Sequence, residues 1–288
     1  MKFDGRRRSS NVEDRRGIKM GKAGGMGLGG IIIVGIIMWL TGNNPLDALR
    51  MAGTESAMEQ SSDYKETEED KYLMDFASAV LAGTEDVWTE IFKENGITYT
   101  PPKLVVFNGA VQSACGGATA QSGPFYCSAD QSIYLDLSFF KEMESQLGKG
   151  AGGDFAWTYV IAHEVGHHVQ YLLGTLTKVQ QARASAKSEA EANRYSVRLE
   201  LQADFYAGLW AHYDNKNFKS LEDGDIEEGL NTASAIGDDR LQKRARGYAV
   251  PDSFNHGTSA QRSRWLKKGL QSGDISLGDT FTPAYDEL

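Results

Sequence analysis

A histidine–glutamate–histidine cluster at His163, Glu164 and His167 is the part of the sequence best suited to chemistry. It lies in WTYVIAHEVGHHVQYLLG, residues 157–174, a stretch without proline. On an α-helix, residues four positions apart lie on one face, so the two imidazoles can bind one metal ion while Glu164 lies beside it. Activation of a water by the metal and a carboxylate base is the chemistry that this arrangement supports. The pattern is short and also occurs by chance in helices whose histidines only pack, so it needs support from elsewhere in the chain.

Two carboxylates on a later predicted helix give that support. The segment 188–213 has helical periodicity, and Glu200 and Asp204 fall on its apolar stripe. Carboxylates on a buried face are costly unless they bind a metal or a protonated partner. Zn²⁺ at a catalytic site takes three protein ligands and keeps one position open, so Glu200 is expected to be the third ligand. Asp204, one turn later, can accept the second ring N–H of a ligating histidine, although the reverse assignment, with Asp204 as ligand, stays open.

Three other histidines have different expected roles. His168 directly follows a ligand, so it points about 100° away from it and is expected to pack or to lie at the surface. His212 lies near the end of the predicted helix, where a cation complements the helix dipole. His256 lies just before the cap of another predicted helix, where it can donate to the oxyanion of a tetrahedral intermediate or make a structural hydrogen bond. Arg262 and Tyr248 are weaker candidates for the oxyanion role.

The elements that must position these residues are predicted to be mainly helical, with a small sheet, which is an α+β fold class. Asp154 is expected to cap the motif helix, and Gly174 to end it. The hydrophobic periodicity predicts two more helices and two strands, at residues 63–94, 177–186, 104–107 and 132–137 respectively.

Cys115 and Cys127 are the two cysteines of the chain, twelve positions apart. Two cysteines cannot by themselves form a structural zinc site, which needs four ligands. If this part of the protein is exported, the surroundings are oxidising and a local disulfide is the expected state. If it is cytoplasmic, two buried free thiols are the alternative.

Charge is distributed unevenly along the chain. Residues 1–22 carry eight basic and three acidic side chains, a net charge of +5, so the remainder carries −14 of the total of −9. An acidic body does not attract a phosphate backbone, and nucleic acid is therefore not expected as a partner.

An uncharged, apolar stretch follows the basic N-terminus. Residues 23–46 contain IIIVGIIMWL and are just long enough to form a transmembrane helix, which needs about 20 apolar residues. The positive charge before it predicts a cytoplasmic N-terminus (1–22) and export of the rest of the chain from the inner membrane into the periplasm. Residues 47–62 are interpreted as a linker and 63–288 as the catalytic domain. A cleaved signal peptide is the alternative, but no suitable cleavage site follows the apolar stretch.

These motifs together resemble a known family. His163-Glu164-x-x-His167 followed by Glu200-x-x-Ala203-Asp204 is similar to the gluzincin branch of the zinc peptidases. The basic RRSSNVEDRR start, the single predicted span, the segment from Gly123 to Asp130 and HEVGHHVQ resemble, more closely, the predicted neutral zinc metallopeptidases of bacteria. The likeness runs from Arg7 to about Gly269.

The resemblance implies a membrane-anchored, zincin-like metallopeptidase with one Zn²⁺ and a peptide or protein substrate. It implies His163, His167 and Glu200 as ligands, Glu164 as catalytic base and Asp204 as a residue that orients a ligand. Zincin sheets also suggest that the strand 132–137 lies near the metal and pairs with an extended peptide. A catalytically silent scaffold at the membrane, or a zinc amidase that acts on a cell-wall peptide, is the alternative. The sequence does not indicate an oligomeric state.

Overall fold

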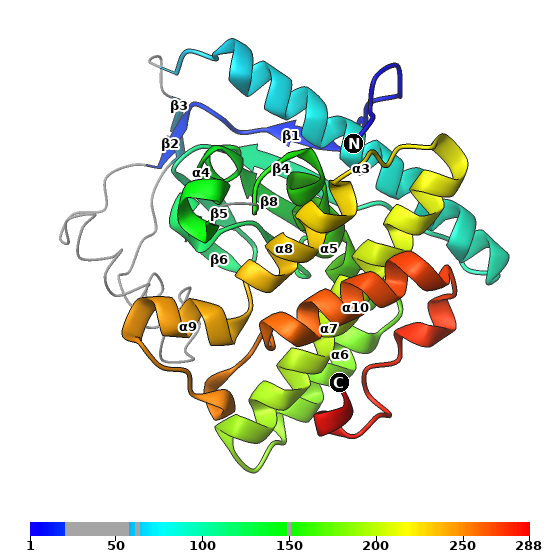
Figure 1. Cartoon of the computed structure of the whole chain (residues 1–288). Coiled ribbons are helices and arrows are strands. Elements are labelled where there is room, and N and C mark those ends of the chain that lie inside the picture. The colour runs from blue at the N-terminus through cyan, green and yellow to red at the C-terminus, as the bar shows by residue number, and fades with distance from the viewer. Residues whose placement is uncertain (21–57, 61–63, 149–150) are drawn as a thin grey trace. The chain divides into compact units, whose positions relative to one another are not determined.

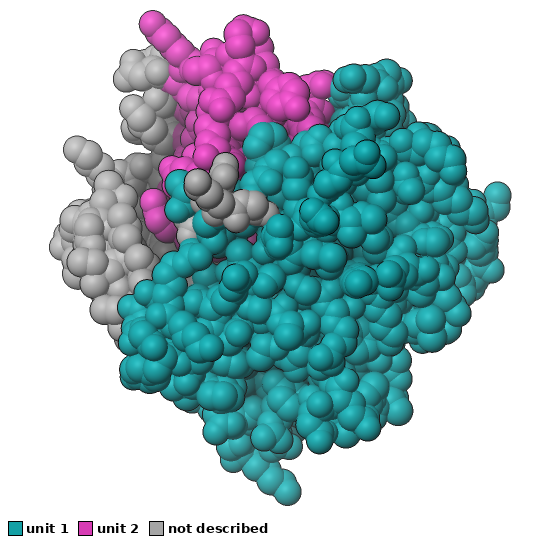
Figure 2. Space-filling model, in the orientation of Figure 1, with its two compact units in different colours: residues 1–9, 79–101, 143–288 teal, residues 10–78, 102–142 magenta. Residues whose placement is uncertain are grey.

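The computed structural model describes residues 1–20, 58–60, 64–148 and 151–288, which form two compact units. Unit 1 consists of residues 1–9, 79–101 and 143–288, and unit 2 consists of residues 10–78 and 102–142 (Figure 2). The described secondary structure is mainly helical with small sheets (Figure 1), which confirms the α+β class.

Unit 1 is built from helices. They include the second part of α3 and the helices α5 to α10: α3 (Glu68–Glu94), α5 (Asp154–Leu172), α6 (Thr175–Ala184), α7 (Glu189–Phe218), α8 (Asp225–Ala235), α9 (Asp238–Arg246) and α10 (Ser259–Ser272). Helix α7 packs against both α5 and α10 (Figure 1). Ser188 is the N-cap of α7, because its hydroxyl accepts a hydrogen bond from the Glu191 N–H.

Glycines bring these helices unusually close together. A Cβ atom on Gly208 of α7 would lie 2.1 Å from the carbonyl oxygen of Leu266, and one on Gly269 of α10 would lie 2.0 Å from that of Phe205. Gly166, within the HEVGH motif of α5, faces the backbone of Ala203 on α7, where a Cβ would be 3.0 Å from the carbonyl oxygen. Only glycine permits the contacts at Gly208 and Gly269, so the separation of α7 and α10 is set by their backbones.

Unit 2 contains a four-stranded sheet in the order β1-β4-β8-β7. Strand β4 pairs in parallel with β1 and with β8, and β7 runs antiparallel to β8; the strands are β1 (Val12–Asp14), β4 (Lys103–Phe107), β7 (Phe125–Cys127) and β8 (Ser132–Asp136). Two antiparallel pairs complete the strands, β2 (Ile18–Met20) with β3 (Met58–Gln60) and β5 (Ala110–Ser113) with β6 (Gly116–Thr119).

The core of unit 2 lies between the sheet and the β5–β6 hairpin. It includes Val105, Phe107, Val111 and Tyr134. The predicted disulfide is confirmed: Cys115, in the turn between β5 and β6, is bonded to Cys127 at the end of β7. The disulfide therefore ties the hairpin to the edge of the sheet.

Helix ends in unit 2 are held by charge. The first turn of α3 is acidic, and Lys141 of α4 (Ser138–Leu147) lies 2.8 Å from the Asp70 carboxylate. Asp70 also accepts a hydrogen bond from the N–H of Thr67, whose hydroxyl in turn accepts one from the N–H of Asp70. The acidic start of α3 is therefore anchored as well as solvated.

The boundaries of several predicted elements needed correction. The motif helix begins at Asp154, one residue earlier than a cap at Asp154 implies, so its N-cap is Gly153 and not the aspartate. Gly174 follows the helix with φ of 75°, in the left-handed region that its expected stop role requires. Helix α7 runs five residues beyond Tyr213, the predicted end.

The N-terminal segment, residues 1–22, was predicted to be a basic, cytoplasmic N-terminus, and its location stays a prediction. In the structure, residues 1–9 belong to unit 1, and residues 12–14 form strand β1 of the sheet in unit 2. The predicted transmembrane stretch, residues 23–46, lies outside the described residues, as does most of the predicted linker, 47–62. None of the described helices has the length and apolar character needed to span a membrane.

Candidate metal centre

Helices α5 and α7 bring the three predicted ligands together. The Nε2 atom of His163 lies 3.2 Å from one carboxylate oxygen of Glu200, and Nε2 of His167 lies 3.4 Å from the other. One ligand atom from each of the three residues lies within 4.8 Å of those of the other two. The four-residue spacing on α5 puts the two imidazoles on one face, and that face is turned toward α7.

The arrangement fits a zinc ion. Ligand atoms about 2.0–2.1 Å from a tetrahedral Zn²⁺ lie roughly 3.4 Å from one another. The separations between Glu200 and the two histidines are close to that value. Two imidazoles and one carboxylate are also the ligand set of many catalytic zinc sites, which keep a fourth position for water or substrate.

Glu164 is placed next to the first ligand on α5. It is 8% exposed, and its carboxylate makes no hydrogen bond or ion pair to any residue in the described part of the chain. A carboxylate that is not already occupied can exchange a proton with a bound water, as a general base must.

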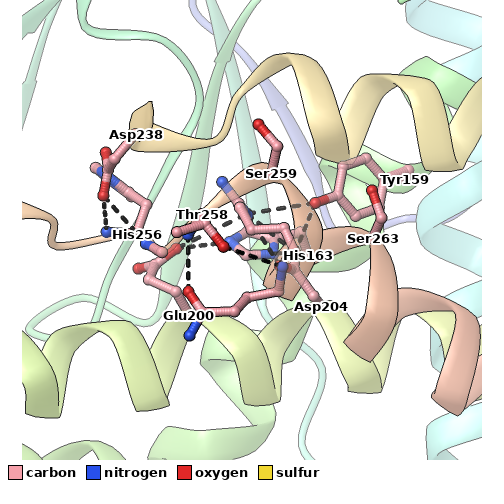
Figure 3. Close-up of polar contacts among 12 residues, drawn as sticks. Tyr159, His163, Glu200, Asp204, Asp238, His256, Thr258, Ser259 and Ser263 are labelled. Carbon is pink, nitrogen blue, oxygen red and sulfur yellow. Dashed lines mark hydrogen bonds and ion pairs between the residues drawn. The ribbon is translucent and has the colours of Figure 1, made fainter. Parts of the chain in front are cut away.

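Asp204 lies behind His163 and is fully buried (Figure 3). Both of its oxygens are held by Arg262, with Nε 2.9 Å from Oδ2 and Nη2 2.9 Å from Oδ1, and Tyr159 donates its hydroxyl hydrogen to Oδ1 over 2.5 Å. The Nδ1 atom of His163 is 2.9 Å from Oδ1, but the ring is not aligned for a hydrogen bond, so the contact is electrostatic. The Asp204 carboxylate is therefore held in place next to Nδ1 of His163.

Charges in this cluster shift one another's proton affinities. Burial alone would raise the pKa of Glu200, but His167 and His163 bring it well below its usual value. Burial would lower the pKa of His163, but Asp204 and Glu200 raise it to about 10. For Asp204, burial is outweighed mainly by the Arg262 guanidinium, which lowers its pKa. Both carboxylates thus stay ionised at neutral pH.

His256 is paired with an aspartate that the sequence interpretation missed. Its Nδ1 atom lies 3.2 Å from Asp238 Oδ1, and Asp238 Oδ2 accepts backbone N–H groups from Asn255, His256 and Gly257. Burial would lower the pKa of His256, but Asp238 and, less strongly, Glu200 raise it. The side chain is 33% exposed and its Nε2 atom is not bonded to any described residue. The pair lies on the opposite side of Glu200 from Tyr159 (Figure 3).

The remaining candidates do not take the roles that were considered for a ligand or an oxyanion donor, although Arg262 Nη2 lies 3.9 Å from Glu200 Oε2. His168 is fully buried and lies 2.6 Å from the Thr100 carbonyl oxygen, as its predicted packing role requires. His212 lies 2.9 Å from the Leu270 carbonyl oxygen and well before the end of α7, so the predicted dipole role is wrong. Tyr248 is 60% exposed. Arg262 is committed to Asp204 and is not free to bind an oxyanion.

Tyr159, Asp238 and the role of Arg262 were not predicted. Tyr159 is one turn before His163 on the motif helix, so helical spacing could have identified it. Asp238 is the first residue of α9, where an aspartate usually serves the helix dipole, and nothing in its own sequence context points to His256.

A histidine pair and a glutamate around one point, with a second glutamate beside them, form a candidate metal centre. The chain belongs to the family described as "Putative neutral zinc metallopeptidase", whose pattern it matches over residues 1–281.

Relatives share this sequence over most of its length. The chain is similar to a protein of Escherichia coli (strain K12) named "Uncharacterized protein YpfJ", with 46% identity over 288 residues that cover 98% of this chain and 99% of the relative. It is also similar to "Uncharacterized protein Rv2575" of Mycobacterium tuberculosis, with 43% identity over 195 residues, 65% of this chain and 64% of the relative. No solved structure matches the chain.

Proposed function

We propose that this protein is a zincin-like, zinc-dependent peptidase that hydrolyses peptide bonds with Glu164 as general base. The observation that carries the proposal is the convergence of His163, His167 and Glu200 within 4.8 Å, with Glu164 adjacent. Membership of the zinc metallopeptidase family supports the same conclusion. A purely structural zinc would have no use for a buried, unpaired carboxylate next to a ligand.

Each residue of the site has a defined task in this mechanism. Zinc held by the three ligands would supply a Lewis acid that polarises the scissile carbonyl and brings the pKa of water toward about 7. Glu164 accepts the proton of the attacking water and passes it to the leaving amine. Asp204, clamped by Arg262, places a negative charge 2.9 Å from Nδ1 of His163, which favours a hydrogen on Nδ1 and leaves Nε2 for the metal.

His256 completes the mechanism as a hydrogen-bond donor. Asp238 lies against Nδ1 and raises the pKa of the His256 imidazole, which favours the charged form that carries a hydrogen on Nε2. A donor aimed at the oxygen that becomes negative stabilises the transition state more than the ground state. The strand β8, proposed to pair with an extended substrate, belongs to unit 2, and that role stays a prediction.

We propose that the protein lies at the outer face of the cell membrane. The Cys115–Cys127 disulfide supports an oxidising, extracytoplasmic compartment, because disulfides are rare in the reducing cytosol. The apolar composition of residues 23–46 supports attachment to lipid.

The proposal is tested with Glu164→Gln in the full-length, zinc-loaded protein. We expect the variant to retain zinc, measured by elemental analysis, and to lose cleavage of a mixed peptide library, because glutamine cannot accept the proton. Glu189→Gln, an exposed position at the start of α7, is the matched control and should cleave normally. Cell-wall fragments assayed in parallel, with and without chelator, distinguish a peptidase from an amidase. Undiminished cleavage by Glu164→Gln would refute the role of Glu164, and a wild-type protein that holds zinc but cleaves neither substrate would favour the scaffold alternative.

A further inference from the structure

The N-terminal segment is an integral part of unit 1. The guanidinium of Arg6 holds the carboxylate of Asp214 with two hydrogen bonds, Nη1 to Oδ2 over 3.0 Å and Nη2 to Oδ1 over 2.6 Å. Asp214 is fully buried in α7, and Gly83 leaves room for the guanidinium, because a Cβ there would lie 2.9 Å from it. Withdrawal of Arg6 would leave a buried carboxylate without its partner, which is strongly unfavourable.

The next residues are equally integral to unit 2. Strand β1 pairs in parallel with β4, with Val12 opposite Leu104 and Asp14 opposite Val106. Arg16 follows, with its side chain only 4% exposed, and its Nη2 atom is 2.7 Å from both the Asp14 and the Glu66 carboxylates. Both carboxylates are partly open to solvent, so these ion pairs add little stability, and the β1–β4 pairing is what ties this segment to unit 2.

The chain leaves and re-enters unit 2 at one place. Strand β2 pairs with β3 in an antiparallel register that sets Met20 opposite Met58 and Ile18 opposite Gln60. Residues 21–57, which connect the two strands, number 37. A helix needs about 20 residues to cross a bilayer, so a return journey needs about 40 and a turn as well. Only one stretch of this connection, residues 23–46, is apolar, and residues 47–57 carry Asp47, Arg50 and Glu55, so the connection does not supply two membrane-crossing helices.

A single crossing is also incompatible with the pairing, because it would place β2 and β3 on opposite sides of the bilayer. We infer that residues 1–20 and the two peptidase units occupy the same side of the membrane. This replaces the topology predicted from the charge pattern, in which the basic N-terminus stays in the cytoplasm while the rest is exported. Two of the positive charges that suggested cytoplasmic retention make ion pairs within the fold, where Arg6 binds the buried Asp214 and Arg16 binds Asp14 and Glu66. The inference does not depend on the zinc site being catalytic.

The test uses single cysteines in the full-length protein expressed in a Gram-negative host. Lys2→Cys, at a side chain that is 64% exposed, marks the N-terminal segment, and Asp286→Cys, at an exposed C-terminal position, marks unit 1. The protein without an added cysteine is labelled in parallel, which gives the background from Cys115 and Cys127. Spheroplasts are treated with a membrane-impermeant maleimide before and after lysis. Labelling of both positions before lysis, or of both only after it, is the expected result; labelling of one before and the other only after lysis would overturn the inference.

A second variant tests whether the N-terminal segment is packed in the native protein. Arg6→Met should lower the melting temperature of the detergent-solubilised protein by at least about 5 °C, because it leaves Asp214 buried without its partner. Lys2→Met, which removes a nearby exposed charge, should change it by no more than about 2 °C. Equal melting temperatures for Arg6→Met and wild type would show that the segment is not docked and would remove the basis of the inference.

Discussion

Replacement of Arg262 by methionine should strongly destabilise unit 1. Arg262 and Asp204 are both buried and are joined by two hydrogen bonds of 2.9 Å. Methionine fills much of the same space but leaves the Asp204 carboxylate without a positive partner. Loss of one member of a buried ion pair costs about 3–5 kcal/mol. At roughly 2–4 °C per kcal/mol for a domain of this size, the melting temperature should fall by about 6–20 °C.

The measurement is thermal unfolding followed by circular dichroism, with two further variants. Arg183→Met, an exposed position on α6, is the matched control and should stay within about 0.5 kcal/mol of wild type. The double variant Arg262→Met with Asp204→Asn removes both charges and should recover more than half of the loss, because the remaining amide can still bond to Tyr159. A loss below about 1 kcal/mol for Arg262→Met alone would refute the view that Asp204 is a buried, ionised residue clamped by the arginine.

Three further outcomes are expected. Replacement of both Cys115 and Cys127 by serine should lower the free energy of unfolding of unit 2 by about 3 kcal/mol, because the twelve-residue loop is no longer closed, and an unchanged denaturant midpoint would contradict this. His256→Gln should lower kcat by about 10²–10³-fold with little change in KM, whereas His212→Gln should leave both near wild type; a normal kcat for His256→Gln would exclude its role at the oxyanion. The hydrogen bond from Lys141 lowers the pKa of Asp70. The stability that this ion pair provides is therefore present above about pH 4 and is lost as the pH falls through the lowered pKa. Asp70→Asn should therefore cost up to about 1 kcal/mol at pH 7 and progressively less below pH 4, and a difference that is constant from pH 2 to 7 would disprove the pairing.

The convergence of His163, His167 and Glu200 could be predicted from the sequence because the patterns that indicate it are local. His163 and His167 are four residues apart on one helix, and Glu200 lies on the apolar stripe of another, where an unexplained carboxylate is costly. The disulfide followed from two cysteines near each other in the chain. In each case the residues that carry the pattern lie within one or two turns of a helix or within a short stretch of chain.

The parts that could not be predicted depend on contacts between distant segments. Asp238 is recognisable as the partner of His256 only once the chain between them has folded, because an aspartate at a helix start has an ordinary explanation. Strand β1 has three residues, two of them acidic, and follows shortly after a run of arginines, so its sequence shows no alternating apolar pattern that would predict a strand. The charge pattern of residues 1–22 did not indicate that Arg6 and Arg16 also make ion pairs with the distant Asp214 and Glu66.

The backbone contact between α7 and α10 has a consequence for how this protein can vary. Since Gly208 and Gly269 let the two main chains touch, the distance from Asp204 to Arg262 does not depend on the size of intervening side chains. Apolar residues around the crossing can change during evolution, and rearrange, without altering the reach of the guanidinium to the carboxylate. Gly208 and Gly269, in contrast, cannot change. Even a single added methyl group would push the two helices apart and displace Asp204, which lies beside His163. Substitutions at these two glycines should therefore cause loss of function, although the glycines lie outside the candidate metal centre and have no side chain that could take part in chemistry.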